Sequence, residues 1–108
     1  MAAKRIHLKS EEQLRRLFMP FIRGGALFVA TDDPYSIGDE LALLVQLPGD
    51  KEETLVKGKV VWLAPARPGR AEMRGVGVQF LEDKSHLRNR IETLLGHLGE
   101  SNAPTATM

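Results

Sequence analysis

The sequence predicts a single, mainly β domain, built as an antiparallel barrel or sandwich and completed by a C-terminal helix. Short β-prone runs alternate with turn residues as far as residue 81, a pattern that is typical of all-β folds. Beyond that point the apolar residues recur with the period of a helix. The chain has 108 residues, which is enough for one modest core.

Composition excludes several classes of function. The chain has 15 Lys and Arg against 14 Asp and Glu, and this near balance gives no support for a nucleic-acid partner. It has no cysteine, which excludes disulfides, thiolate metal sites and cysteine nucleophiles. No apolar run reaches membrane-spanning length, and the N-terminus lacks the apolar core of a signal peptide. We therefore expect a cytoplasmic protein that does not insert into a membrane.

The first two elements are a short strand and a short helix. Residues 4–9 alternate polar and apolar side chains, as a half-buried strand does. Ser10 and Gln13 have the spacing of a capping box, which predicts that a helix begins there. The apolar stripe of this helix ends at Phe18. Because Pro20 disfavours a helical conformation at the residue before it, the helix is expected to be only about two turns long.

Four further strands are predicted, separated by loops rich in Gly, Pro and Asp. They span residues 26–31, 40–47, 54–64 and 74–81. In the second of them, alternate side chains from Leu41 to Leu47 are apolar and are expected to face the core. Gly58 interrupts the third and marks a bend, a bulge or a close backbone approach. Gly75 and Gly77 leave one face of the last strand almost bare, which suits a strand crossing or barrel curvature.

The last predicted element is an amphipathic helix of about 15 residues that lays its apolar face on the barrel. Its apolar residues recur at helical spacing: Leu87, Ile91, Leu94, Leu95 and Leu98. Gly99 follows as the expected residue after the C-cap. Arg88 and Arg90 lie off this stripe and are expected in solvent. Residues 100–108 are small and polar, so we expect a disordered tail after a domain that spans residues 1–99.

Several segments, taken together, resemble the PilZ-domain family. They are MPFIRGGALF (19–28), YSIGDE (35–40), GKVVW (58–62), GVGVQF (75–80), IETLL (91–95) and PTATM (104–108). MPF before a Gly-Gly strand entry is the mark of the subgroup that acts in type IV pilus assembly. The resemblance implies a six-stranded antiparallel PilZ-type barrel with a short N-terminal helix and a C-terminal amphipathic helix.

Most PilZ domains bind cyclic di-GMP through an RxxxR pair near the N-terminus and a later DxSxxG turn. Arginine suits this role because its guanidinium pairs with phosphates and stacks on guanine. Here no arginines four residues apart precede Gly25, and Pro20 and Ile22 occupy the Asp and Ser positions of the turn. The chain therefore resembles the subgroup that lacks the cyclic di-GMP motifs. The alternative is a receptor with a different site, formed by the RxxxR pair Arg70 and Arg74 before the last strand.

Five residues are candidates for partner binding: Phe21, Trp62, Met19, Arg15 and Arg23. Phe21 follows a proline in a turn, where no regular element requires it to be buried. Trp62, the only tryptophan, is either a core residue on the face of the preceding Val60 or an exposed interface anchor, and the resemblance favours the anchor. Met19 suits either role. The two arginines are either solvated or rim an apolar patch that complements an acidic partner.

No catalytic constellation is recognisable in the sequence. The three histidines lack ligand spacing, and there is no Ser/His/Asp set or phosphate loop. We therefore expect no catalysis, no metal and no cofactor. The resemblance implies an adaptor for type IV pilus biogenesis and twitching motility. Its implied partners in cyclic di-GMP signalling are a FimX-type protein with degenerate GGDEF and EAL domains and the PilB-type extension ATPase.

Overall fold

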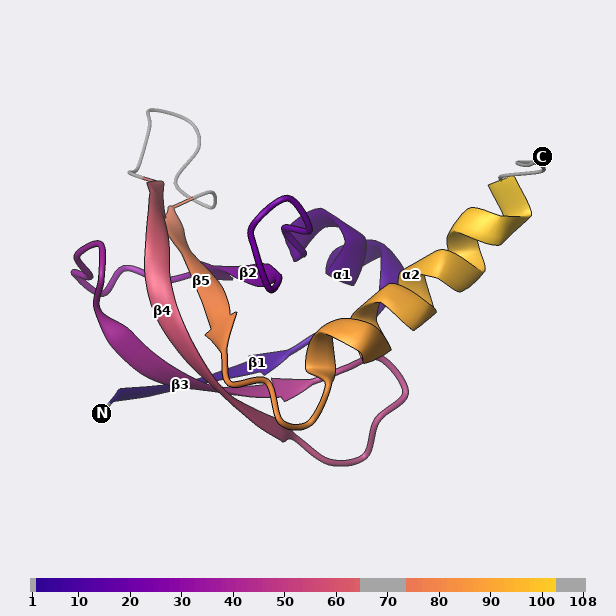
Figure 1. The fold of residues 1–108 in the computed structure, drawn as a ribbon, viewed down its shortest axis with the longest axis horizontal. Helices are drawn as coiled ribbons and strands as arrows, with labels where there is room; N and C mark the ends of the chain where they lie inside the picture. The colour runs from indigo at the N-terminus through magenta and orange to yellow at the C-terminus, as the bar shows by residue number, and fades with distance from the viewer. Residues whose placement is uncertain (1, 65–73, 103–108) are drawn as a thin grey trace.

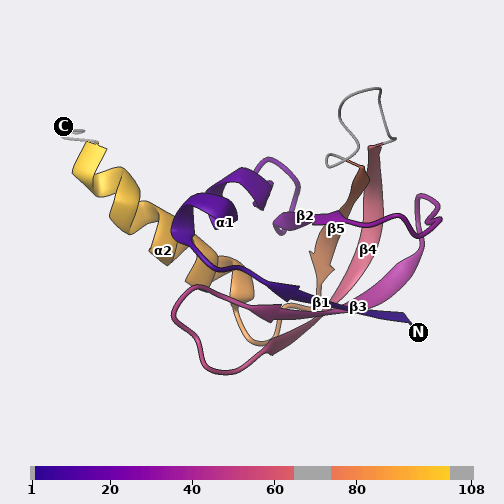
Figure 2. The same ribbon diagram turned by 180° about the vertical axis from the view of Figure 1, so that it is seen from behind.

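The structure is a computed structural model, and it describes residues 2–64 and 74–102. The elements in chain order are β1 (Ala2–His7), α1 (Glu11–Leu17), β2 (Ala26–Ala30), β3 (Glu40–Gln46), β4 (Thr54–Ala64), β5 (Gly75–Leu81) and α2 (Leu87–Asn102). A curled sheet occupies one end of the molecule and the two helices lie together at the other (Figure 1). Figure 2 shows the same arrangement from behind.

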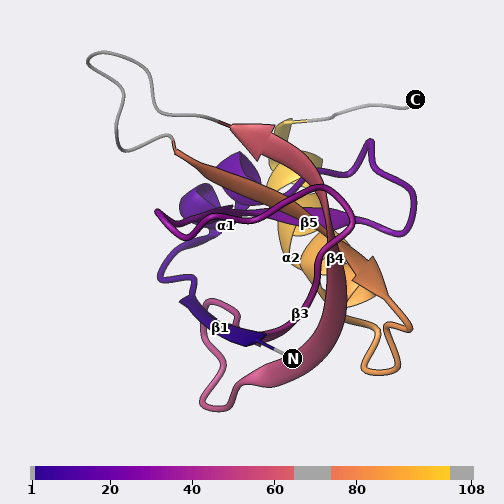
Figure 3. The ribbon, with the colours of Figure 1, turned by 90° about the vertical axis from the view of Figure 1, so that its left-hand side faces the viewer.

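The described strands form one sheet in the order β1-β3-β4-β5-β2. Viewed end-on, the sheet curls into an open half-barrel, with β1 and β2 as its two edges (Figure 3). The prediction of six antiparallel strands is therefore wrong for residues 2–64 and 74–102, which contain five strands, and β1 pairs with β3 in parallel. Residues 32–39 form a loop, as their turn residues predicted. The parallel pair is possible because α1 and β2 provide the long connection that it needs.

Two ion pairs fasten the loop after β2 to its neighbours. Lys4 of the edge strand β1 pairs with Asp33, and Arg74 pairs with Asp32 at 3.0 Å. The hydrogen bond from Lys4 lowers the pKa of the Asp33 carboxyl and raises the pKa of the Lys4 ammonium. Exposed pairs of this kind add little stability. The contact of Lys4 with Asp33 nevertheless connects the two sides of the open half-barrel.

The inner face of the half-barrel carries the core. The side chains from Leu41 to Leu47 that were predicted to face inward are buried, and this prediction is confirmed. Leu87 and Ile91 of α2 are fully buried in the same core. Helix α2 thus covers one end of the half-barrel with its apolar stripe, as the sequence predicted.

Ser10 caps the start of α1 as predicted, and Gln13 reaches back one residue beyond the N-cap. The Gln13 N–H donates to the Ser10 hydroxyl at 3.1 Å, while the Gln13 side chain accepts from the Lys9 N–H at 2.9 Å. The helix ends at Leu17, because Phe18 already has extended backbone. A helix of seven residues is marginal in isolation. It is held by the buried side chains of Leu14 and Phe18.

Helix α2 begins at a cap that the apolar pattern did not reveal. The Asp83 carboxylate accepts hydrogen bonds from the Leu87 and Arg88 N–H groups at 2.8 and 2.9 Å. A carboxylate at this end also interacts favourably with the helix dipole. The helix continues through Gly99 to Asn102, so the first residues assigned to the tail are helical. Residues 103–108 lie outside the described part of the chain.

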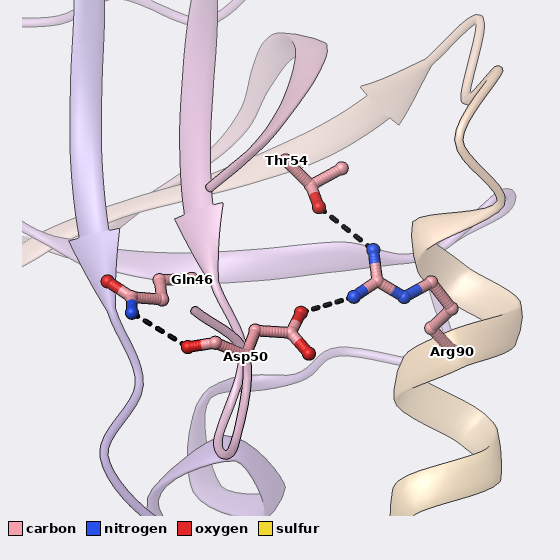
Figure 4. Close-up of polar contacts among 4 residues, drawn as sticks. All are labelled: Gln46, Asp50, Thr54 and Arg90. Carbon is pink, nitrogen blue, oxygen red and sulfur yellow. Dashed lines mark hydrogen bonds and ion pairs between the residues drawn. The ribbon is translucent and has the colours of Figure 1, made fainter. Parts of the chain in front are cut away.

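Arg90 joins α2 to the β3–β4 hairpin (Figure 4). Its guanidinium donates to the Thr54 hydroxyl at 2.8 Å and forms an ion pair with Asp50. The Asp50 carbonyl in turn accepts from the Gln46 amide at 2.8 Å. The Arg90 side chain is still 40% exposed, but the sequence did not predict its contacts with the hairpin. Its place off the apolar stripe does not reveal that the hairpin approaches that side of the helix.

Candidate partner-docking surface

The connection between α1 and β2 turns at two glycines. Gly24 and Gly25 have φ angles of 79° and 88°, in the left-handed region that other residues adopt only at a cost. The Gly25 N–H donates to the Ile22 carbonyl at 2.7 Å, and the Gly25 carbonyl accepts from the Phe80 N–H at 2.9 Å. The Gly-Gly pair therefore makes the turn and ties it to β5.

Phe21 lies in this connection, between two further attachments. On one side of it, the Met19 N–H donates to the Ala26 carbonyl at 2.8 Å. On the other, the Gln79 side-chain amide donates to the Arg23 carbonyl, also at 2.8 Å. Phe21 itself is 73% exposed. The backbone on both sides of the ring is thus held in place while the ring remains in solvent.

Trp62 lies on the outer face of the half-barrel and is 49% exposed. Regular alternation would place it on the inner face with Val60. The register shifts between them, however, so that Val60 opposes Val78 and Trp62 opposes Gly77. A bulge at Val61 therefore turns the tryptophan outward. Of the two alternatives for Trp62, the core residue on the face of Val60 is wrong, because counting alternate residues does not reveal a bulge. The exposed position is the one that an anchor requires.

Gly77 leaves the space that Trp62 and Met19 occupy. A Cβ atom at Gly77 would lie 2.9 Å from the Trp62 Cβ and 3.1 Å from the Met19 Sδ. Phe28 opposes Gly77 from β2 and therefore points to the same face. A Cβ atom at Gly75 would lie only 2.8 Å from the Phe28 Cζ. The two glycines thus clear the outer face of β5 for side chains from its neighbours.

We call the aromatic side chains of Phe21, Phe28 and Trp62 the candidate docking residues. Phe28 was missed in the sequence, although the glycines at alternate positions of β5 were a usable signal: a strand with one bare face leaves room for large side chains on both neighbours. Phe28 is half-buried. Its ring widens the apolar area beside Trp62.

The other candidate residues take different places. Met19 is only 9% exposed, and its Sδ and the Trp62 Cβ border the same space over Gly77. Arg15 is exposed in the last turn of α1, and Arg23 is exposed in the connection after Phe21. Neither arginine forms an ion pair with another residue in the described part of the chain. The binding role of all five candidates stays a prediction.

A Gly77→Val substitution is expected to disturb Trp62 directly, because the new side chain would compete with Trp62 and Met19 for the same space. Overpacking of this kind costs roughly 1–3 kcal/mol of unfolding free energy. We expect that loss in chemical denaturation, together with a shift of the Trp62 emission. Gly96→Ala is the matched control, since nothing lies within 4 Å of its added Cβ. An unchanged emission spectrum in Gly77→Val would contradict this packing.

A separate cavity of about 320 Å³ lies between α2 and the β3–β4 hairpin. Its charged lining residues, Asp50 and Arg90, are engaged with each other. In residues 2–64 and 74–102, no three His, Asp or Glu side chains gather as a metal site would require. No helix in the same part of the chain is long and apolar enough to cross a membrane.

The family model described as PilZ domain matches residues 4–97, from β1 to within α2. No curated protein matches the chain.

Proposed function

The chain belongs to the PilZ domain family, and on that premise we propose that it is a non-catalytic adaptor required for type IV pilus assembly. In this proposal it binds a FimX-type GGDEF-EAL protein and the PilB-type extension ATPase. In this proposal the chain does not bind cyclic di-GMP itself. The partner senses the messenger, and this chain relays the signal in the cytoplasm.

The observation that carries the proposal is the exposure of two aromatic side chains on a fixed part of the fold. Phe21 and Trp62 are 73% and 49% exposed. Large aromatic side chains bury much apolar area when a partner covers them. Because hydrogen bonds hold the backbone beside Phe21 and a sheet holds Trp62, little conformational freedom remains to be lost on binding.

The residues at the positions of the cyclic di-GMP motifs favour an adaptor over a nucleotide receptor. The DxSxxG positions hold Pro20 and Ile22, which offer no carboxylate or hydroxyl to a guanine. Of the alternative pair, Arg74 lies 3.0 Å from the Asp32 carboxylate. A phosphate that used Arg74 would compete with that carboxylate. Arg70 lies outside the described residues.

Calorimetric titration of the purified chain tests the proposal. We expect no binding of cyclic di-GMP at micromolar concentrations, and saturable binding of the purified FimX-type protein and of the PilB-type ATPase. A micromolar or tighter dissociation constant for the dinucleotide alone would establish the alternative, a receptor with a different site. Absence of binding to both proteins would refute the adaptor role.

A further inference from the structure

The outer face of β4 carries a row of four exposed or half-exposed side chains. Residues 56, 58 and 60 of this strand are buried, so the residues between them point outward. The bulge at Val61 then adds Trp62 to the same face. The row reads, in chain order, Leu55, Lys57, Lys59 and Trp62. It has an apolar residue at each end and two cations between them.

Leu55 provides an exposed apolar side chain at the end of the row opposite Trp62. It is 62% exposed, although it lies within a regular strand. Directly opposite, Leu44 of β3 points to the same face and is half-buried. Cross-strand neighbours of this kind lie about 5 Å apart. The two leucines therefore form a continuous apolar pair on the outside of the sheet.

The charge between the two apolar ends is positive. Glu40 opposes Lys59 across the sheet, and its carboxylate lies 3.8 Å from the Lys57 ammonium. Glu40 therefore pairs with Lys57, while Lys59 forms no ion pair with another residue in the described part of the chain. At the leucine end, Arg5 opposes Leu44 and is paired with Glu53. A partner that covers this face would be electrostatically complementary to it if the partner presented acidic side chains to Lys57 and Lys59.

We propose that the outer face of β4 binds one amphipathic helix of a partner protein, with an apolar anchor at each end and acidic residues between them. An added β-strand does not fit here, because β4 already pairs with β3 and β5 on its two sides. Recognition must therefore use side chains. This inference rests on the proposed adaptor function, and it specifies the chemistry of the partner's docking element.

The length of the row sets the length of the helix. Leu55 and Trp62 lie about 20 Å apart, at roughly 3.3 Å per residue with allowance for the bulge. A helix covers that distance in about 13 residues, at 1.5 Å per residue. The two anchors should therefore lie almost four turns apart on one face of the partner helix.

A designed peptide tests the proposal without any natural partner. The probe is a helix-forming peptide of about 18 residues, with leucines at both ends of one face and glutamates between them. A second peptide replaces those glutamates by lysines. Trp62 is the only tryptophan of the chain, so its emission reports binding at one end of the row. We expect saturable binding of the acidic peptide, and at least about tenfold weaker binding of the basic one, a difference of about 1.4 kcal/mol.

Variants at the distant end decide whether one helix spans the row. Leu55→Ser should weaken binding of the acidic peptide about tenfold, as measured by Trp62 emission. Lys84→Ala, which changes an exposed residue before α2, should leave the affinity unchanged. The double variant Lys57→Glu and Lys59→Glu should reverse the preference between the two peptides. No emission change with the acidic peptide, or full affinity in Leu55→Ser, would overturn the proposal. Failure of the pilus proteins to bind would refute the adaptor function and leave the peptide result standing.

Discussion

Replacing Trp62 or Phe21 by alanine is expected to weaken binding of the pilus partners by a factor of about 30 or more, while the domain stays folded. This corresponds to about 2 kcal/mol, the usual range for an interface hot spot. The expectation follows from exposure: both rings contribute apolar area that only a partner can bury fully. Phe21→Ala should hardly change stability, since its ring is mostly in solvent already.

Binding and folding must be measured together for these variants. Calorimetry with each purified partner gives the dissociation constant, and thermal melting followed by circular dichroism gives the stability. Lys51→Ala, in the hairpin at the opposite end of β4, is the control and should bind as the wild type does. Loss of the cooperative thermal transition in Trp62→Ala or Phe21→Ala would mean that these residues serve the core. Unchanged affinity in both variants would remove them from the interface.

Replacing Ile91 by alanine is expected to cost about 2–5 kcal/mol of unfolding free energy, the largest effect on stability predicted for this chain. Ile91 is fully buried where α2 covers the end of the half-barrel. Its truncation removes apolar contacts and leaves a cavity that the surrounding strands fill only in part. For a domain whose total stability is about 5–15 kcal/mol, this is a substantial share.

Urea denaturation, followed by circular dichroism and by Trp62 emission, measures this loss. Thr93→Ala on the same helix is the matched control, since Thr93 is exposed. Its effect should stay within about 0.5 kcal/mol, as for most surface substitutions. If Ile91→Ala cost no more than Thr93→Ala, α2 would not be packed on the half-barrel as described.

Local patterns predicted much of the fold. The capping-box spacing of Ser10 and Gln13 located α1, and alternation from Leu41 to Leu47 identified the buried face of β3. Helical spacing likewise placed Ile91 in the core. Each of these features depends on residues close together in the sequence, because hydrogen bonding and side-chain direction within one element follow a fixed period.

The candidate site was predictable only in part. Phe21 and Trp62 are exposed, as an anchoring role requires, but Met19 lies beneath the surface and Phe28 was missed. Trp62 faces outward because of a bulge at Val61. A bulge arises from the pairing of β4 with β5, and the period of one strand carries no trace of it.

The sequence alone determined which segments are strands or helices and which of their faces are apolar, since these depend on neighbours within a few residues. Only the tertiary structure decided that β1 lies parallel to β3, that Arg90 reaches the β3–β4 hairpin, and that Trp62 lies over Gly77. The physical reason is that strand register and side-chain contacts between elements depend on residues far apart in the chain. These contacts form only when the whole sheet and its covering helix pack together.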